Sequence, residues 1–79
     1  MSSLREKFGQ RLKTLRVSRG MSQEQFAELV GISVDFLSLI ERGINAPSFE
    51  NLEYFAMRLR LPISELFTFG SDERTNQSK

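Results

Sequence analysis

QEQFAELVGISVDFLSLIER, residues 23–42, predicts two short helices joined by a tight turn. Two such helices can cross at a steep angle only where the side chain at the crossing is small and the turn tolerates positive φ. Ala27 meets the first demand and Gly31 the second, because glycine reaches the left-handed region at little cost. The residues that we expect to point inward and hold the second helix against the first are Phe26, Val30, Ile32, Leu37 and Ile40. The outer face of residues 34–42 then forms a protruding ridge.

Serine residues mark where these two helices begin. Ser22 is a good N-cap and Gln25 follows three residues later, as in a capping box, so the first of them spans about residues 23–30. Ser33 caps the second, which spans about residues 34–42. These serines are therefore explained as caps, and no base accompanies them that would make them nucleophiles.

Amphipathic spacing predicts three more helices around this pair. One helix precedes it, over about residues 3–19. Another begins after the N-cap Ser48 and ends at Leu61, because Pro62 follows. A short fifth helix spans residues 63–67. The apolar stripes are Leu4, Phe8, Leu12 and Leu15 in the first helix, and Leu52, Phe55, Ala56 and Leu59 in the fourth.

Length and composition indicate one small helical domain. The chain has 79 residues, of which 39% are hydrophobic and 27% charged, an ordinary globular balance. No segment shows the alternation of a strand. We therefore expect an all-α fold, a compact five-helix domain over residues 1–69. The polar residues 70–79 lack periodicity and are expected to be a disordered tail.

The absence of cysteine and histidine excludes several classes of function. The chain has no thiolate nucleophile and lacks the commonest general base and metal ligand, so it cannot build a structural zinc site or a Ser-His-Asp triad alone. We expect no enzymatic activity, cofactor, metal or small-molecule ligand. The N-terminal segment lacks the apolar centre of a signal peptide, and no apolar run approaches the ~18–20 residues that span a bilayer. We expect a cytoplasmic protein without a membrane partner.

Positive charge is concentrated near the N-terminus. Residues 1–20 hold six basic side chains and one acidic, whereas residues 21–79 hold five basic and nine acidic, for a formal net charge of +1. Charge segregated in this way can present a basic face to a polyanion, with Arg5, Arg11 and Arg19 adding diffuse attraction. The alternative is an ordinary solvated helix face.

Several segments in register resemble one family of DNA-binding proteins. SQEQFA (22–27), VGIS (30–33) and LSLIERG (37–43) resemble the helix-turn-helix of the lambda-repressor-like (Xre/Cro) regulators, and the resemblance covers about residues 8–67. The segment LPISELF (61–67) is similar to stand-alone members, notably controller proteins of restriction–modification systems and small prophage regulators. The resemblance implies a sequence-specific transcription regulator that binds a pseudo-palindromic operator in double-stranded DNA as a homodimer.

The same resemblance implies roles for individual side chains. Gln23 matches a position that contacts phosphate, where free N–H groups at a helix N-terminus also attract anions on physical grounds. Arg16 and Glu41 match a charge pair between the first helix and the end of the recognition helix, and Arg42 and Asn45 flank a turn that touches phosphate in relatives. The candidate DNA-binding residues are Arg16, Ser22, Gln23, Ser33, Val34, Asp35, Phe36, Ser38, Leu39, Arg42 and Asn45.

The ridge is unusual, since a DNA-reading helix ordinarily offers Arg, Lys, Gln or Asn to base edges. Val34, Phe36 and Leu39 are apolar and suit thymine methyl groups, and Asp35 can accept a hydrogen bond from the amino group of cytosine. Alternatively, Phe36 belongs partly to the core and Leu39 covers a neighbouring helix. The second functional hypothesis is a protein-interaction module, such as an antitoxin, that uses this ridge. Salt-dependent DNA binding distinguishes the two.

The last predicted helix has more apolar residues than a monomer of this size requires. Ile63, Leu66, Phe67 and Phe69 are interpreted as a dimerisation surface, because the fifth helix forms the homodimer interface in the proteins that the chain resembles. A twofold dimer places two recognition helices about one DNA turn, ~34 Å, apart. The alternative is that these side chains only seal the core.

Overall fold

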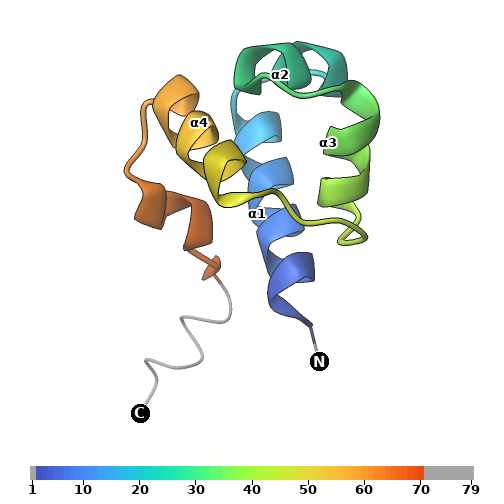
Figure 1. Cartoon of the computed structure of the whole chain (residues 1–79), viewed down its shortest axis with the longest axis vertical. Coiled ribbons are helices and arrows are strands. Elements are labelled where there is room, and N and C mark those ends of the chain that lie inside the picture. The colour runs from blue at the N-terminus through green and yellow to red at the C-terminus, as the bar shows by residue number, and fades with distance from the viewer. Residues whose placement is uncertain (1, 71–79) are drawn as a thin grey trace.

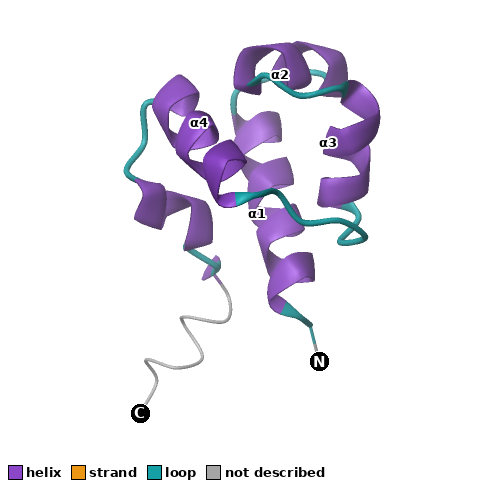
Figure 2. Ribbon diagram, in the orientation of Figure 1, coloured by secondary structure: helices purple, strands orange, loops and turns teal. Residues whose placement is uncertain are grey.

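The computed structural model describes residues 2–70, which form four α-helices and one 3-10 helix (Figure 1). In chain order the elements are α1 (Leu4–Ser18), α2 (Gln23–Val30), α3 (Val34–Glu41), α4 (Phe49–Leu59) and η1 (Ile63–Phe67). Figure 2 shows helices joined by loops and no strand over this range, which confirms the all-α class. Residues 71–79 of the predicted tail lie outside the described residues.

The short fifth helix predicted over residues 63–67 is present as a 3-10 helix, so residues 2–70 hold four α-helices and the five-helix count was slightly off. The N–H group of Glu65 donates to the carbonyl oxygen of Pro62 at 2.9 Å, an i to i+3 bond. Such winding suits a segment of only five residues, where the longer bonds of an α-helix gain little. The preceding helix α4 also ends earlier than predicted, at Leu59, because Arg60 adopts a left-handed conformation with φ 59°.

Serine caps begin the helices where they were predicted. The hydroxyl oxygens of Ser22, Ser33 and Ser48 accept the N–H group of the third residue along, at 3.1, 3.0 and 3.0 Å. Gln25 completes the capping box, since its side-chain oxygen accepts the N–H group of Ser22 at 2.8 Å. These bonds satisfy N–H groups that the helices themselves leave without an acceptor.

The core lies where the helices pack around α1 and contains most of the predicted apolar residues. Its members are Phe8, Leu12, Leu15, Phe26, Ala27, Val30, Leu37, Ile40, Phe55, Leu59 and Leu66. Leu4 was expected in this stripe but is 62% exposed. It is the first residue of α1 and lies at the edge of a shallow apolar hollow that also includes Phe49 and Phe67. The buried stripe of α1 therefore begins one turn later, at Phe8.

Two glycines allow close approaches between elements. Gly9 is buried in α1, and a Cβ atom there would collide with the carbonyl oxygen of Ile40 on α3. Gly31 ends α2 at φ 83°, and a Cβ atom there would collide with the ring of Tyr54. The first glycine sets how closely α1 and α3 pack, and the second combines a tight turn with a contact to α4.

Candidate nucleic-acid interface

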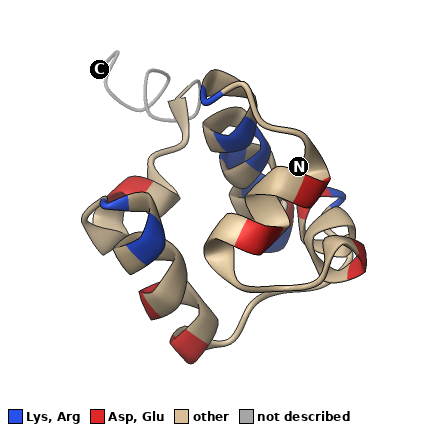
Figure 3. Cartoon of the chain, turned by 90° about the horizontal axis from the view of Figure 1, so that it is seen from above, with Lys and Arg blue, Asp and Glu red and all other residues tan. Residues whose placement is uncertain are grey.

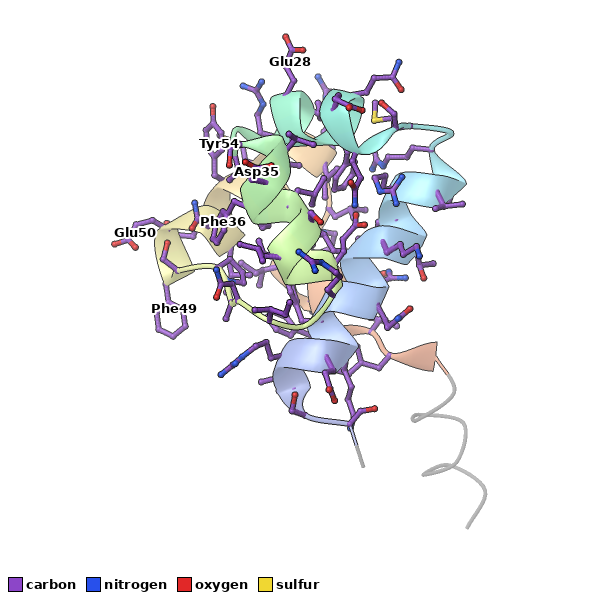
Figure 4. All side chains as sticks on the ribbon, turned by 90° about the vertical axis from the view of Figure 1, so that its right-hand side faces the viewer. Glu28, Asp35, Phe36, Phe49, Glu50 and Tyr54 are labelled. Atoms are coloured by element: carbon purple, nitrogen blue, oxygen red, sulfur yellow. The ribbon has the colours of Figure 1, made fainter. Side chains whose placement is uncertain are left out.

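The α3 helix has one face in the core and the other at the surface. Leu37 and Ile40 are fully buried, whereas Val34 and Asp35 at its N-terminal end are exposed. Figure 4 looks onto this outer face, with α1 beside it and α2 above. The predicted helix pair is therefore present: α2 has the predicted bounds, and α3 ends one residue early, at Glu41.

A buried carboxylate, Glu41, joins α3 to two other segments. Its oxygens accept hydrogen bonds from Arg16 Nε at 2.8 Å and Arg16 Nη2 at 3.1 Å, which confirms the predicted charge pair as a bidentate contact. Gln23 Nε2 also donates to Glu41, at 3.0 Å. Arg16 makes a further bond, from Nη1 to the carbonyl oxygen of Met21 at 3.0 Å. The end of α3 is thus fixed against α1 and against the start of α2.

The N-terminus of α2 was predicted to contact phosphate, and its backbone suits that role better than the side chain of Gln23 does. The side chain of Gln23 was expected to contact phosphate but is half-buried and bonded to Glu41. Ser22 accepts the N–H group of Gln25, whereas the N–H groups of Gln23 and Glu24 precede the first intrahelical bond. An anion at this helix end therefore meets backbone N–H groups first, in a field that favours negative charge.

The outer face of α3 is narrower than predicted. Of the expected ridge residues, Ser33, Val34, Asp35 and Arg42 are exposed, but Phe36, Ser38 and Leu39 are half-buried. Phe36 packs against the core, which corrects its assignment to a freely exposed ridge and bears out the alternative considered for it. The physical reason is that the ring of Phe36 packs against the buried residues of the core, so only part of it stays exposed.

The loop after α3 presents Arg42 and Asn45 at the surface, as predicted. The N–H groups of Ile44 and Asn45 both donate to the carbonyl oxygen of Leu39, at 2.9 and 3.3 Å, and this fixes the loop against the end of α3. The guanidinium of Arg42 makes a long contact, 3.4 Å, to the carbonyl oxygen of Ser38. Arg42 and Asn45 thus lie directly after the C-terminal end of α3.

Among residues 2–70, α1 carries more basic residues than any other element, and Figure 3 colours the basic residues blue on the ribbon. Arg5, Arg11 and Arg19, expected to supply diffuse attraction, each donate a hydrogen bond to a backbone carbonyl oxygen elsewhere in the fold. The acceptors are Ile44, Glu65 and Leu59, at 3.3, 2.8 and 2.9 Å respectively. These arginines keep their charge but also brace α1 against the rest of the domain, a structural role that the charge pattern did not reveal.

The predicted dimerisation residues separate into two groups. Leu66 is fully buried in the monomer, so it cannot contact a partner, and its assignment to the surface patch was wrong. Ile63 is 45% exposed, and Phe67 and Phe69 are half-buried. Phe67 packs on Phe8 with a centroid distance of 5.3 Å and on Phe69 with one of 6.2 Å. This segment therefore covers the core and still leaves part of its apolar surface exposed.

Residues 2–70 hold neither a cluster of metal ligands nor a membrane-spanning helix. No three acidic side chains lie together in a way that could hold a metal ion. In the same part of the chain, no helix combines the length and apolar character that crossing a membrane requires.

An α2–turn–α3 unit with a rigidly held second helix, a polar helix N-terminus and a basic α1 defines a helix-turn-helix domain. The sequence model of the helix-turn-helix family matches residues 12–66. The chain belongs to this family. The members that it matches are DNA-binding transcription regulators rather than enzymes.

Particular relatives include a controller protein and a phage repressor. The chain is 36% identical to the control protein C.MunI of Mycoplasma sp, over 86% of this chain and 93% of that protein. It is 33% identical to the cryptic phage CTXphi transcriptional repressor RstR of Vibrio cholerae, over 87% of this chain, and spans only 60% of that protein's length. The crystal structure of the restriction-modification controller protein C.AhdI from Aeromonas hydrophila is similar, with a TM-score of 0.73, 40% identity, and coverage of 78% of this chain and 94% of that one.

Proposed function

We propose that this DNA-binding regulator acts as a homodimer on a pseudo-palindromic operator, with the outer face of α3 in the major groove. The observation that carries the proposal is the Glu41 cluster, which holds α3 through Arg16 and Gln23 while Val34 and Asp35 stay exposed. A helix fixed in this way can enter a groove without losing the conformational entropy that a mobile segment would lose.

In this proposal, different groups supply affinity and specificity. The backbone N–H groups at the start of α2, together with Arg42 and Asn45, bind phosphates and set the position of the domain on the duplex. Val34 and Asp35 face the base edges, where a methyl contact with thymine and a hydrogen bond from the amino group of cytosine suit their chemistry. Leu39, which is half-buried, contributes at the edge of this surface.

The proposed dimer uses the exposed part of the C-terminal apolar surface. Ile63 leads this patch, with the outer edges of Phe67 and Phe69 beside it. A twofold interface is self-complementary, so one such patch on each protomer is sufficient. The resulting spacing of about one DNA turn, ~34 Å, would match the two half-sites of an operator.

The class of gene that the protein regulates is proposed from the relatives that it matches. Control proteins and a phage repressor are among them, so we propose regulation of a restriction–modification or prophage gene, in the cytoplasm and without catalytic activity.

The test titrates the protein into labelled DNA from the gene's own upstream region. Fluorescence anisotropy reports binding, and the titration is repeated at several salt concentrations. We expect two chains per site and an affinity that falls steeply with salt, as binding through several phosphates requires. An unrelated duplex of equal length serves as the control and should bind at least a thousandfold more weakly. Equal binding to both duplexes would refute sequence-specific regulation, and binding of a protein partner instead would favour the interaction-module hypothesis.

A further inference from the structure

A broad surface hollow of about 980 Å³ runs along α1 beside the DNA-facing elements. Gln10, Lys13 and Thr14 of α1 line one side. Gln23 at the start of α2, with Ser38 and Arg42 at the end of α3, lines the other. The hollow is therefore continuous with the surface proposed above to meet DNA, although α1 itself belongs to neither helix of the helix-turn-helix.

The polar side chains of α1 differ in whether they are already bonded. Arg11 and Arg16 are held by Glu65 and Glu41, so their donors are largely used inside the domain. Gln10, Lys13 and Thr14 are exposed, and within residues 2–70 they make no hydrogen bond or ion pair. These three side chains are spaced i, i+3 and i+4, so they share one face of α1.

The charge of this face suits an anion. Lys13 and Arg42 both line the hollow, and the carboxylate of Glu41, which also lines it, is buried and accepts bonds from Arg16 and Gln23. The other acidic lining residue, Glu6, lies in the first turn of α1, and its carboxylate accepts the N–H group of Ser3 at 3.0 Å. Figure 4 shows the exposed carboxylates of Asp35 and Glu50 on the α4 side of α3, away from α1. A phosphate chain that passes the start of α2 therefore finds cationic and neutral donors along residues 10–14 of α1.

We propose that the α1 face formed by Gln10, Lys13 and Thr14 binds the sugar–phosphate backbone of DNA, one or two phosphates beyond those bound at the start of α2. Lys13 supplies a flexible point charge, and Gln10 and Thr14 supply neutral donors to the same strand. The contact adds affinity without reading sequence. It rests on the proposed function, because it requires the operator complex in which α3 occupies the major groove.

The test compares Lys13→Gln with Arg60→Gln in the full chain. Both variants remove one exposed positive charge, but Arg60 lies at the end of α4, which does not line the hollow. The measurement is the slope of log K against log salt concentration on the upstream DNA fragment, combined with phosphate-ethylation interference on the same fragment. Circular dichroism checks that both variants are folded.

The slope for Lys13→Gln should be shallower than that of the wild type by roughly 2, since each lost phosphate contact contributes about 0.9 and a dimer has two copies of Lys13. One interference position in each half-site should disappear in this variant, and Arg60→Gln should retain both the slope and the pattern. If the wild type binds the fragment and Lys13→Gln matches it in slope and pattern, the α1 contact is refuted and the proposed function stands. If the wild type does not bind its fragment, the proposed function fails, and this contact fails with it.

Discussion

At the scale of single residues, Glu41 does most to define the site. Its carboxylate is almost completely buried, with 3% side-chain exposure, and it joins three segments through Arg16 and Gln23. The bond to Arg16 was predictable, because a partly buried carboxylate needs a partner and the resemblance supplied one. The bond to Gln23 was not, because the two residues lie 18 positions apart and no local pattern connects them.

We predict that Glu41→Ala lowers the free energy of unfolding by about 3 kcal/mol or more, since it leaves a buried guanidinium without its charge partner. Urea denaturation followed by circular dichroism measures the change. The matched control is Glu53→Ala, an exposed carboxylate on α4, which should stay within about 0.5 kcal/mol of the wild type. Equal stability of the two variants would show that the Glu41 cluster does not hold α3 in place.

At the scale of elements, the packing of α1 on α3 depends on a glycine that the sequence does not single out. Glycine inside a helix costs about 1 kcal/mol relative to alanine, so Gly9 looks like a weak point in a helical pattern. In the fold its missing side chain lets the backbone of α3 approach at Ile40 and Glu41. Local propensity and tertiary packing thus favour opposite residues at this position.

The sign of the effect of Gly9→Ala follows from this conflict. We expect destabilisation by about 1–3 kcal/mol, because the backbone of α3 cannot move aside as a flexible side chain would. The neighbouring Gln10→Ala, on the exposed side of the same helix, should leave stability nearly unchanged. A thermal or urea unfolding curve decides, and a Gly9→Ala protein more stable than the wild type would contradict the close approach.

The elements themselves could be predicted well wherever the chemistry is local. Ser22, Ser33 and Ser48 cap helices because each side chain needs only the next three residues. The end of α4 was missed, because arginine rarely takes the left-handed conformation that Arg60 has. Burial of Leu66 was missed for a different reason, since it depends on how η1 folds back onto α1 and α4.

At the scale of the whole molecule, the proposed dimer depends on which apolar side chains of the C-terminal segment stay exposed. Burial of Leu66 leaves Ile63 as the central exposed residue of the C-terminal patch. Replacing Leu66 would unfold the core and give no information about assembly, whereas Ile63 can be changed at the surface. The charge pattern is also a property of the whole fold, because α1 carries basic residues from one end of the chain beside α3.

We predict that Ile63→Glu converts a dimer into a monomer, since it places two like charges at a twofold contact. Sedimentation equilibrium measures the mass, and circular dichroism should show unchanged helix content. Val17→Glu, an exposed apolar residue of α1, is the matched control and should remain dimeric. A variant Ile63→Glu with the mass of the wild-type dimer would place the interface elsewhere.

The central claim, that the outer face of α3 reads bases, is tested most directly by Asp35→Asn. The measurement is relative affinity for an operator series in which each base pair is substituted in turn, for this variant, the wild type and the control Glu53→Gln. Asparagine replaces a carboxylate that only accepts with an amide that both donates and accepts and so pairs with adenine, and the preferred base pair should change at one position in each half-site, by about 1–3 kcal/mol. The control should keep the wild-type profile. An unchanged profile for Asp35→Asn at every position would contradict the claim.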